Sequence, residues 1–238
     1  QRIWLVGNVD GYNYTDADSS SLSAELSDAE SGSITGLHSK RDEYHADIVM
    51  FFSPFPGSTC NGLSYLQTTN NVNWNTNAFA TMQACSFGHS IFAHELGHTM
   101  GSRHDWYDDN GTTPATIAHG HIDVAKEFRT IMSYNDRCLD LGFSCSRIPN
   151  FSNPAVSYDG AATGVPSGTS SACAQDDYYI TMLNVKVRVR WSFFRNRHIY
   201  SAMRDIPGTI LHIFLPKHPG VIFSQGYGRF FYLLNIPV

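Results

Sequence analysis

The chain has 238 residues, of which 42% are hydrophobic and 16% are charged, enough for one large domain or for a medium domain with an appendage. No apolar run approaches the roughly 18 residues of a membrane-spanning helix, and the composition excludes collagen-like and low-complexity chains. The formal net charge of −5 argues against a nucleic-acid or anionic-membrane partner for the chain as a whole. We therefore expect a globular protein.

The charge is distributed unevenly along the chain. Residues 1–179 carry 8 basic and 20 acidic side chains, whereas residues 180–238 carry 8 basic and 1 acidic. This change of sign predicts a main domain over residues 1–188, with an N-terminal subdomain to about residue 101, and an atypical basic and aromatic tail over residues 189–238. Three interpretations of the tail stay open: a patch for a membrane or polysaccharide surface, the start of a truncated second domain, or a frameshifted sequence.

Hydrophobic patterning predicts a mixed α/β (α+β) fold. In chain order, we expect a strand over 3–9, short helices near 22–26 and 34–44, a buried strand over 47–52, an edge strand over 62–66, a strand over 79–85, a helix over 91–100 and a last helix over 175–187. Residues 106–170 are rich in Gly, Asn, Asp, Ser and Pro, so they should be mostly loop. Because the buried strand is continuously apolar, both faces of its sheet should be covered.

The helix over 91–100 carries a His-Glu-x-x-His pattern. At about 100° per residue, His94 and His98 lie one turn apart on one face, so both imidazoles can reach a single metal ion. Ser90 is the expected N-cap, and Gly101 is the expected stop.

A third histidine follows the helix. Continued helix would carry His104 about 9 Å away along the axis, so the chain must turn, and Gly101 can take the positive φ that turns it. Three protein ligands leave a fourth position for water, as in a catalytic zinc site. We therefore expect one catalytic Zn2+ held by His94, His98 and His104.

The extended pattern over 94–104 resembles that of the metzincin metallopeptidases. The resemblance includes a Met-turn over 130–134, in which Met132 would form a floor under the zinc ligands. It covers roughly residues 1–188 and implies a metzincin-like zincin fold: a twisted mixed sheet, an active-site helix and a loop-rich C-terminal subdomain.

Further residues resemble one branch of that family. Asp105 directly after His104 is similar to the adamalysin or reprolysin branch, and so is the edge-strand run over 60–65. Residues 129–134, followed by Phe-Ser-Asn-Pro over 151–154, are closer to the secreted reprolysin-like peptidases of bacteria. The resemblance therefore implies a secreted, extracellular protein.

Tyr134 departs from that branch. Its Met-x-Tyr spacing after Met132 is that of astacins and serralysins, in which the tyrosine can approach the zinc. Tyr134 is either a fifth ligand and transition-state hydrogen-bond donor or a packed core phenol, and we favour the core.

These parts predict peptide hydrolysis. Zinc lowers the pKa of its bound water and polarises the scissile carbonyl, while Glu95 removes the water's proton as general base and delivers it to the leaving amine. Two alternatives stay open: a non-catalytic zinc-binding recognition module, against which the intact Glu95 argues, and a zinc amidase acting on a non-protein substrate.

The expected partner is a protein or peptide substrate bound as an extended strand. It would pair antiparallel with the edge strand at Gly62, Leu63 and Ser64, while the Met-turn and the residues after it would wall the side-chain pocket. We expect a monomer without a transmembrane segment or nucleic-acid partner.

Five cysteines without a C-x-x-C pair favour disulfides over a zinc ribbon. The candidates are Cys138 with Cys145 in a short loop and Cys60 with Cys85 in a longer one. Cys173 is then left over, although it could equally pair with Cys138 or Cys145.

Other metal-binding candidates are weaker. They are two histidines and two acidic pairs: His119 and His121, Asp16 with Asp18, and Asp108 with Asp109. We favour structural roles for the histidines over a second metal. Ca2+ is possible at the acidic pairs, but EF-hand spacing is missing and solvated faces are the favoured interpretation.

Overall fold

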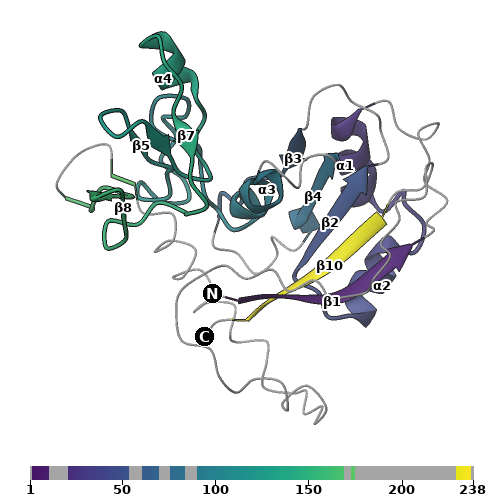
Figure 1. Cartoon of the computed structure of the whole chain (residues 1–238). Helices are drawn as coiled ribbons and strands as arrows, with labels where there is room; N and C mark the ends of the chain where they lie inside the picture. Colours follow the sequence, from purple (N-terminus) through teal and green to yellow (C-terminus); the bar gives the residue numbers. More distant parts are fainter. Residues whose placement is uncertain are drawn as a thin grey trace, which may run out of the picture.

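The computed structural model describes residues 2–10, 21–53, 61–69, 76–83, 90–168, 173–174 and 229–236. Within these ranges the elements are β1 (Arg2–Asp10), α1 (Leu22–Ser31), α2 (Leu37–Glu43), β2 (Ile48–Ser53), β3 (Gly62–Ser64), β4 (Phe79–Gln83), α3 (Ile91–Thr99), β5 (Ile122–Asp123), β6 (Phe128–Arg129), α4 (Asp136–Asp140), β7 (Ser146–Arg147), β8 (Ser157–Tyr158), β9 (Ala161–Ala162) and β10 (Arg229–Ile236). This mixture of strands and helices confirms the α+β class. Figure 1 shows α3 between the main sheet and a part formed mostly of loops.

The main sheet has the strand order β1-β10-β2-β4-β3. Strands β2 and β4 are parallel, whereas β3 lies antiparallel to β4 with Leu63 opposite Thr81. The expected edge strand is confirmed, because β3 is the last strand of the described sheet. It ends at Ser64, two residues earlier than expected.

Alternate residues of β2 pack into two clusters, one on each face of the sheet. The cluster on the α3 side contains Ile48, Met50, Phe52, Ala78, Ala80, Met82, Phe92, Leu96 and Met100. The cluster on the α1 and α2 side contains Leu26, Ala29, Ile34, Leu37, Val49, Phe51 and Phe79. The prediction that both faces are covered is confirmed, and burying each large side chain contributes about 1.5–3 kcal/mol.

Two helix boundaries differ from expectation. α1 runs five residues beyond the predicted segment, and Ser21 caps it by accepting a 3.2 Å hydrogen bond from the Ala24 N–H. The side-chain cap predicted at the start of α3 is wrong. Ser90 has a φ of 60° and makes no cap hydrogen bond, because a capping side chain needs extended backbone there.

The end of α3 follows the prediction. Gly101 has a φ of 91°, its N–H donates to the His98 carbonyl at 2.9 Å, and the Ser102 N–H donates to the Gly97 carbonyl at 2.9 Å. This pair of bonds is the Schellman motif, which ends a helix with a left-handed residue. The chain therefore turns back toward α3 immediately before His104.

The part after α3 is mostly loop, as expected, with five short strands and one short helix among its described residues. Helix α4 was not expected, and it carries Cys138, which forms a disulfide with Cys145. Cys173 is buried and reduced, and its thiol donates to the Thr116 carbonyl at 3.1 Å. Cys60 and Cys85 lie outside the described residues, so their pairing stays a prediction.

Part of the expected tail lies in the main sheet. β10 pairs antiparallel with β1, where Arg2 is opposite Ile236, and with β2, where Phe52 is opposite Arg229. Figure 1 shows this strand inside the sheet. The rest of residues 189–238, the helix expected over 175–187, and Asp16 and Asp18 all lie outside the described residues. None of the helices described is long and apolar enough to cross a membrane.

Candidate metal centre and active site

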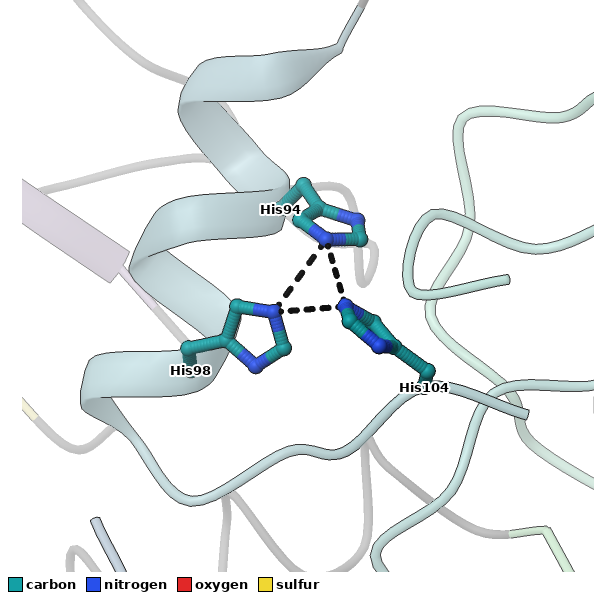
Figure 2. Close-up of side chains that lie close together, drawn as sticks. All are labelled: His94, His98 and His104. Carbon is teal, nitrogen blue, oxygen red and sulfur yellow. Dashed lines mark hydrogen bonds between the residues drawn. The ribbon is translucent and has the colours of Figure 1, made fainter. Parts of the chain in front are cut away.

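Three histidine side chains converge beside α3, as Figure 2 shows. The Nε2 atoms of His94 and His98 are 3.2 Å apart, those of His94 and His104 are 3.2 Å apart, and those of His98 and His104 are 3.0 Å apart. Nitrogens bound to a tetrahedral zinc at 2.0–2.1 Å are about 3.3 Å from one another. The three imidazoles therefore fit one zinc ion, and they form a group of potential metal ligands within the described chain.

Backbone carbonyls orient two of the rings. His94 Nδ1 lies 2.9 Å from the Ile131 carbonyl oxygen, and His98 Nδ1 lies 2.8 Å from that of Ser102. Each Nδ1 therefore carries the proton and donates it, which leaves a lone pair on each Nε2. Lone pairs aimed at one point repel unless a cation lies between them, so this tautomer is the one that binds metal.

Burial keeps all three imidazoles neutral. It lowers the pKa of His98 to about 4 and the pKa of His104 to about 3, and the neighbouring His98 further lowers the pKa of His104. Burial, followed by the charge of His98, holds the pKa of His94 well below its ordinary value. Metal ligation requires the neutral ring, so protons do not compete for these nitrogens near pH 7.

Met132 lies under the helix that carries the ligands. Its side chain is fully buried, and a Cβ placed on Gly97 would overlap its Sδ atom. The same turn supplies the Ile131 carbonyl that orients His94. The position of Met132 agrees with the floor that the resemblance implied, and Gly97 is required for the close approach.

Asp105 ties the third ligand to the Met-turn. Its buried carboxylate accepts hydrogen bonds of 3.0 Å from the N–H groups of Tyr107 and Tyr134. Tyr134 then lies with its ring centroid 4.2 Å from that of His104, and its side chain is 38% exposed. The favoured prediction of a packed core phenol is therefore wrong, because the ring packs on ligand imidazoles at the surface.

Glu95 is buried beside the metal centre. Its Oε2 accepts a 2.7 Å hydrogen bond from Ser64 Oγ, while burial raises its pKa to about 7. A Cβ on Gly62 would come within 2.8 Å of Glu95 Oε1, so only glycine lets β3 approach the carboxylate this closely. Two of the residues expected to bind substrate thus contact the expected general base.

The family profile described as Metallo-peptidase family M12B, reprolysin-like, matches residues 2–161. The chain belongs to this family. The match contains α3, the third histidine and the Met-turn, so the reprolysin-like resemblance is confirmed.

Several curated relatives are similar to this reprolysin-like metallopeptidase, and each is named peptidyl-Asp metalloendopeptidase. The protein of Stenotrophomonas maltophilia (strain K279a) is 29% identical over 197 residues, which cover 79% of this chain and 43% of the relative. That of Xanthomonas campestris pv. campestris is 31% identical over 160 residues, with 66% and 34% covered, and that of Pseudomonas fragi is 38% identical over 93 residues, with 39% and 60% covered. The chain spans less than half the length of the first two relatives.

The remaining metal-binding candidates among the described residues contact other groups of this reprolysin-like domain. His119 is buried, with Nδ1 2.7 Å from the His104 carbonyl oxygen and Nε2 2.8 Å from that of Gly111, so it positions the third-ligand loop. Asp109 Oδ1 forms a salt bridge with Arg103 Nη2 at 2.8 Å. Burial, with Asp105 and Asp136, raises the pKa of Asp108 to about 7. His121 lies apart from the zinc ligands, and its backbone N–H donates to the Thr130 hydroxyl at 2.9 Å.

Two features of the site were missed from the sequence. The Ser64 hydroxyl holds the Glu95 carboxylate. The Arg147 guanidinium donates at 3.1 Å to the carbonyl of Ser133, inside the Met-turn. Neither contact belongs to a sequence motif. The one signal in the sequence concerns Arg147: basic residues are scarce before residue 180, where only 8 occur.

Proposed function

We propose that the chain is a secreted zinc-dependent endopeptidase. The single observation that carries the proposal is the convergence of three imidazole nitrogens, 3.0–3.2 Å apart, beside a buried glutamate. Bound zinc lowers the pKa of a water molecule and polarises a carbonyl group. His94, His98 and His104 hold the ion in this proposal.

Glu95 moves the proton. Its carboxylate takes a proton from the attacking water and returns it to the leaving amine, and a pKa of about 7 suits both directions near neutral pH. Ser64 fixes one carboxylate oxygen by its 2.7 Å hydrogen bond. The partly exposed phenol of Tyr134, beside His104, is in this proposal the donor of a hydrogen bond to the oxygen of the scissile carbonyl.

The substrate is an extended peptide that adds to the outer edge of β3. Leu63 is 37% exposed there, and Ser64 contacts Glu95, so a peptide on this edge passes the proton-transfer group. The relatives' name, peptidyl-Asp metalloendopeptidase, supports an aspartate beside the cleaved bond. The Cys138–Cys145 disulfide supports secretion, because disulfides persist in oxidising compartments.

The test is cleavage of casein with and without a zinc chelator, with zinc content measured on the same samples. We expect chelator-sensitive cleavage by the wild type. Glu95→Gln keeps the shape of the side chain and removes the base, so it should bind one equivalent of zinc and lose at least about 1,000-fold in kcat. Full zinc content without cleavage by the wild type would favour a recognition module or an amidase for a non-protein substrate.

A further inference from the structure

The third zinc ligand is held differently from the other two. His94 and His98 lie on α3, and a backbone carbonyl orients each of their rings through Nδ1. Among the described residues, the ring of His104 lies within hydrogen-bond distance only of the Nε2 atoms of the other two ligands. Apart from the Tyr134 ring packed against it, its placement therefore depends on the backbone that carries it.

A closed hydrogen-bond network surrounds that backbone. Arg103 Nη2 donates to Asp109 Oδ1 at 2.8 Å, and the Gly111 N–H donates to the same oxygen at 2.9 Å. His119 Nε2 lies 2.8 Å from the Gly111 carbonyl oxygen, and His119 Nδ1 lies 2.7 Å from that of His104. The network therefore begins at Arg103 and returns to His104, the next residue in the chain.

Arg103 makes further contacts with the same loop. Its Nη1 donates to the Thr113 carbonyl at 2.7 Å, its backbone N–H donates to the Ala118 carbonyl at 2.7 Å, and its own carbonyl accepts from the Gly120 N–H at 3.2 Å. The backbone of Gly111 lies directly against the guanidinium, because a Cβ placed there would overlap it. One arginine therefore holds both the middle and the end of the loop that follows the third ligand.

Partial burial strengthens the network. The side chains of Arg103 and Asp109 are only 14% and 20% exposed, so water and salt screen their ion pair little. Burial acts to raise the pKa of Asp109, but the Arg103 hydrogen bond and the Gly111 N–H lower it below its ordinary value, which keeps the pair ionised. At the other end of the network, the His119 ring stacks on Trp106 with the ring centroids 3.8 Å apart.

We propose that Arg103 is a positioning residue for the third zinc ligand. Its guanidinium holds residues 105–118, and this loop, through His119, fixes the backbone carbonyl of His104 and with it the direction of the imidazole. Groups that orient metal ligands from outside the coordination sphere contribute about 10- to 100-fold to metal affinity. The inference rests on the zinc site of the proposed function, but it requires no peptide cleavage.

Metal binding tests the inference. Arg103→Gln should lower zinc affinity by about 10- to 100-fold in competition with a fluorescent chelator. The visible spectrum of the Co2+-loaded variant should also change, because it reports coordination geometry, which a displaced third ligand alters. Lys126→Gln is the matched control: it removes the exposed ion pair between Lys126 and Asp159, outside the network, and should bind both metals as the wild type does.

Two further variants separate positioning from folding. Gly111→Ala keeps the charge of Arg103 but displaces its guanidinium, so it should also weaken zinc binding. Arg103→Lys keeps the charge without the planar fork and should fall between the wild type and Arg103→Gln. Circular dichroism and urea unfolding of the zinc-free proteins identify the variants that fold.

The outcomes distinguish this inference from the proposed function. Lower zinc affinity with an altered Co2+ spectrum in a folded variant supports a positioning role, whereas a purely structural role would lower only the stability of the zinc-free protein. Unchanged zinc affinity and an unchanged Co2+ spectrum in the folded variants would overturn the inference alone. A wild type that binds no zinc would overturn the proposed function, and this inference with it.

Discussion

The Ser64 hydroxyl on β3 donates a 2.7 Å hydrogen bond to Oε2 of Glu95 on α3. This bond joins the edge of the sheet to the carboxylate beside the zinc ligands. In the proposed mechanism, a peptide paired with β3 is held in register with the group that moves the proton. Substrate binding and proton transfer would then depend on the same three-residue strand.

Ser64→Ala should raise the pKa of Glu95. Burial raises that pKa to about 7, whereas the Ser64 hydrogen bond lowers it, so removing the hydroxyl moves it further upward. The base must be ionised to accept a proton, and the acid limb of kcat/KM should therefore shift to higher pH in the variant. Activity should fall most below pH 7 and recover in alkali. An unshifted acid limb, judged against the exposed-site control Ser39→Ala, would contradict this role.

Gly97→Ala should destabilise the protein and weaken zinc binding. A Cβ at this position overlaps Met132 Sδ and approaches the Phe151 ring to 3.0 Å. Overpacking of this kind costs about 1–3 kcal/mol, which exceeds the gain of about 1 kcal/mol from replacing a helical glycine. Urea unfolding gives the stability, and competition with a fluorescent chelator gives the zinc affinity.

A second-site change identifies the cause of that loss. Gly97→Ala combined with Met132→Ala removes the overlapping side chain, so the pair should cost less than the two single changes added together. Strict additivity would show that the overlap with Met132 is not responsible.

Zinc binding should resist mild acid. The pKa values of about 4 for His98 and about 3 for His104 keep these ligands neutral at pH 5.5, whereas a histidine with an ordinary pKa near 6.5 is about 90% protonated there. Zinc affinity should therefore change little from pH 8 to pH 5.5 and fall as the pH drops through 4. A loss of about tenfold per ligand by pH 5.5, measured by chelator competition, would contradict the buried, neutral state.

Removing the Cys138–Cys145 disulfide should reduce stability. The two cysteines are seven positions apart in the sequence, so the lost loop constraint is worth about 2–3 kcal/mol. The Cys145 carbonyl also accepts a hydrogen bond from Arg129, whose Nη1 donates to the Ser133 carbonyl of the Met-turn. Cys138→Ser with Cys145→Ser should therefore lower the urea midpoint. An unchanged midpoint would show that this segment holds its shape without the covalent link.

The parts predicted best from the sequence are those fixed by nearby residues. His94, His98, Gly101 and His104 lie within one helix and the turn after it, so helical periodicity and one positive φ determine their arrangement. The buried strand β2 was also predicted from local sequence, because a continuous apolar run of that length is typical of a buried strand.

The parts missed depend on contacts between distant segments. The Ser64–Glu95 bond joins a strand to a helix, and the position of Arg147 depends on how β7 packs beside the Met-turn. Tyr134 was misjudged because its contacts, a ring packed on His104 and an N–H bonded to Asp105, join segments that are distant in the sequence. Local patterns carry little information about such pairings.

The position of β10 affects how the chain acquires its structure. It lies between β1 and β2, although residues 11–228 separate it from β1 and residues 54–228 separate it from β2. Contacts of such high sequence separation close slowly, because the entropy of a long loop is lost before they form. A ribosome releases the chain from its N-terminal end, so β1 and β2 wait for residues 229–236 before this sheet can be completed. The completion of this sheet is therefore delayed relative to the synthesis of β1 and β2.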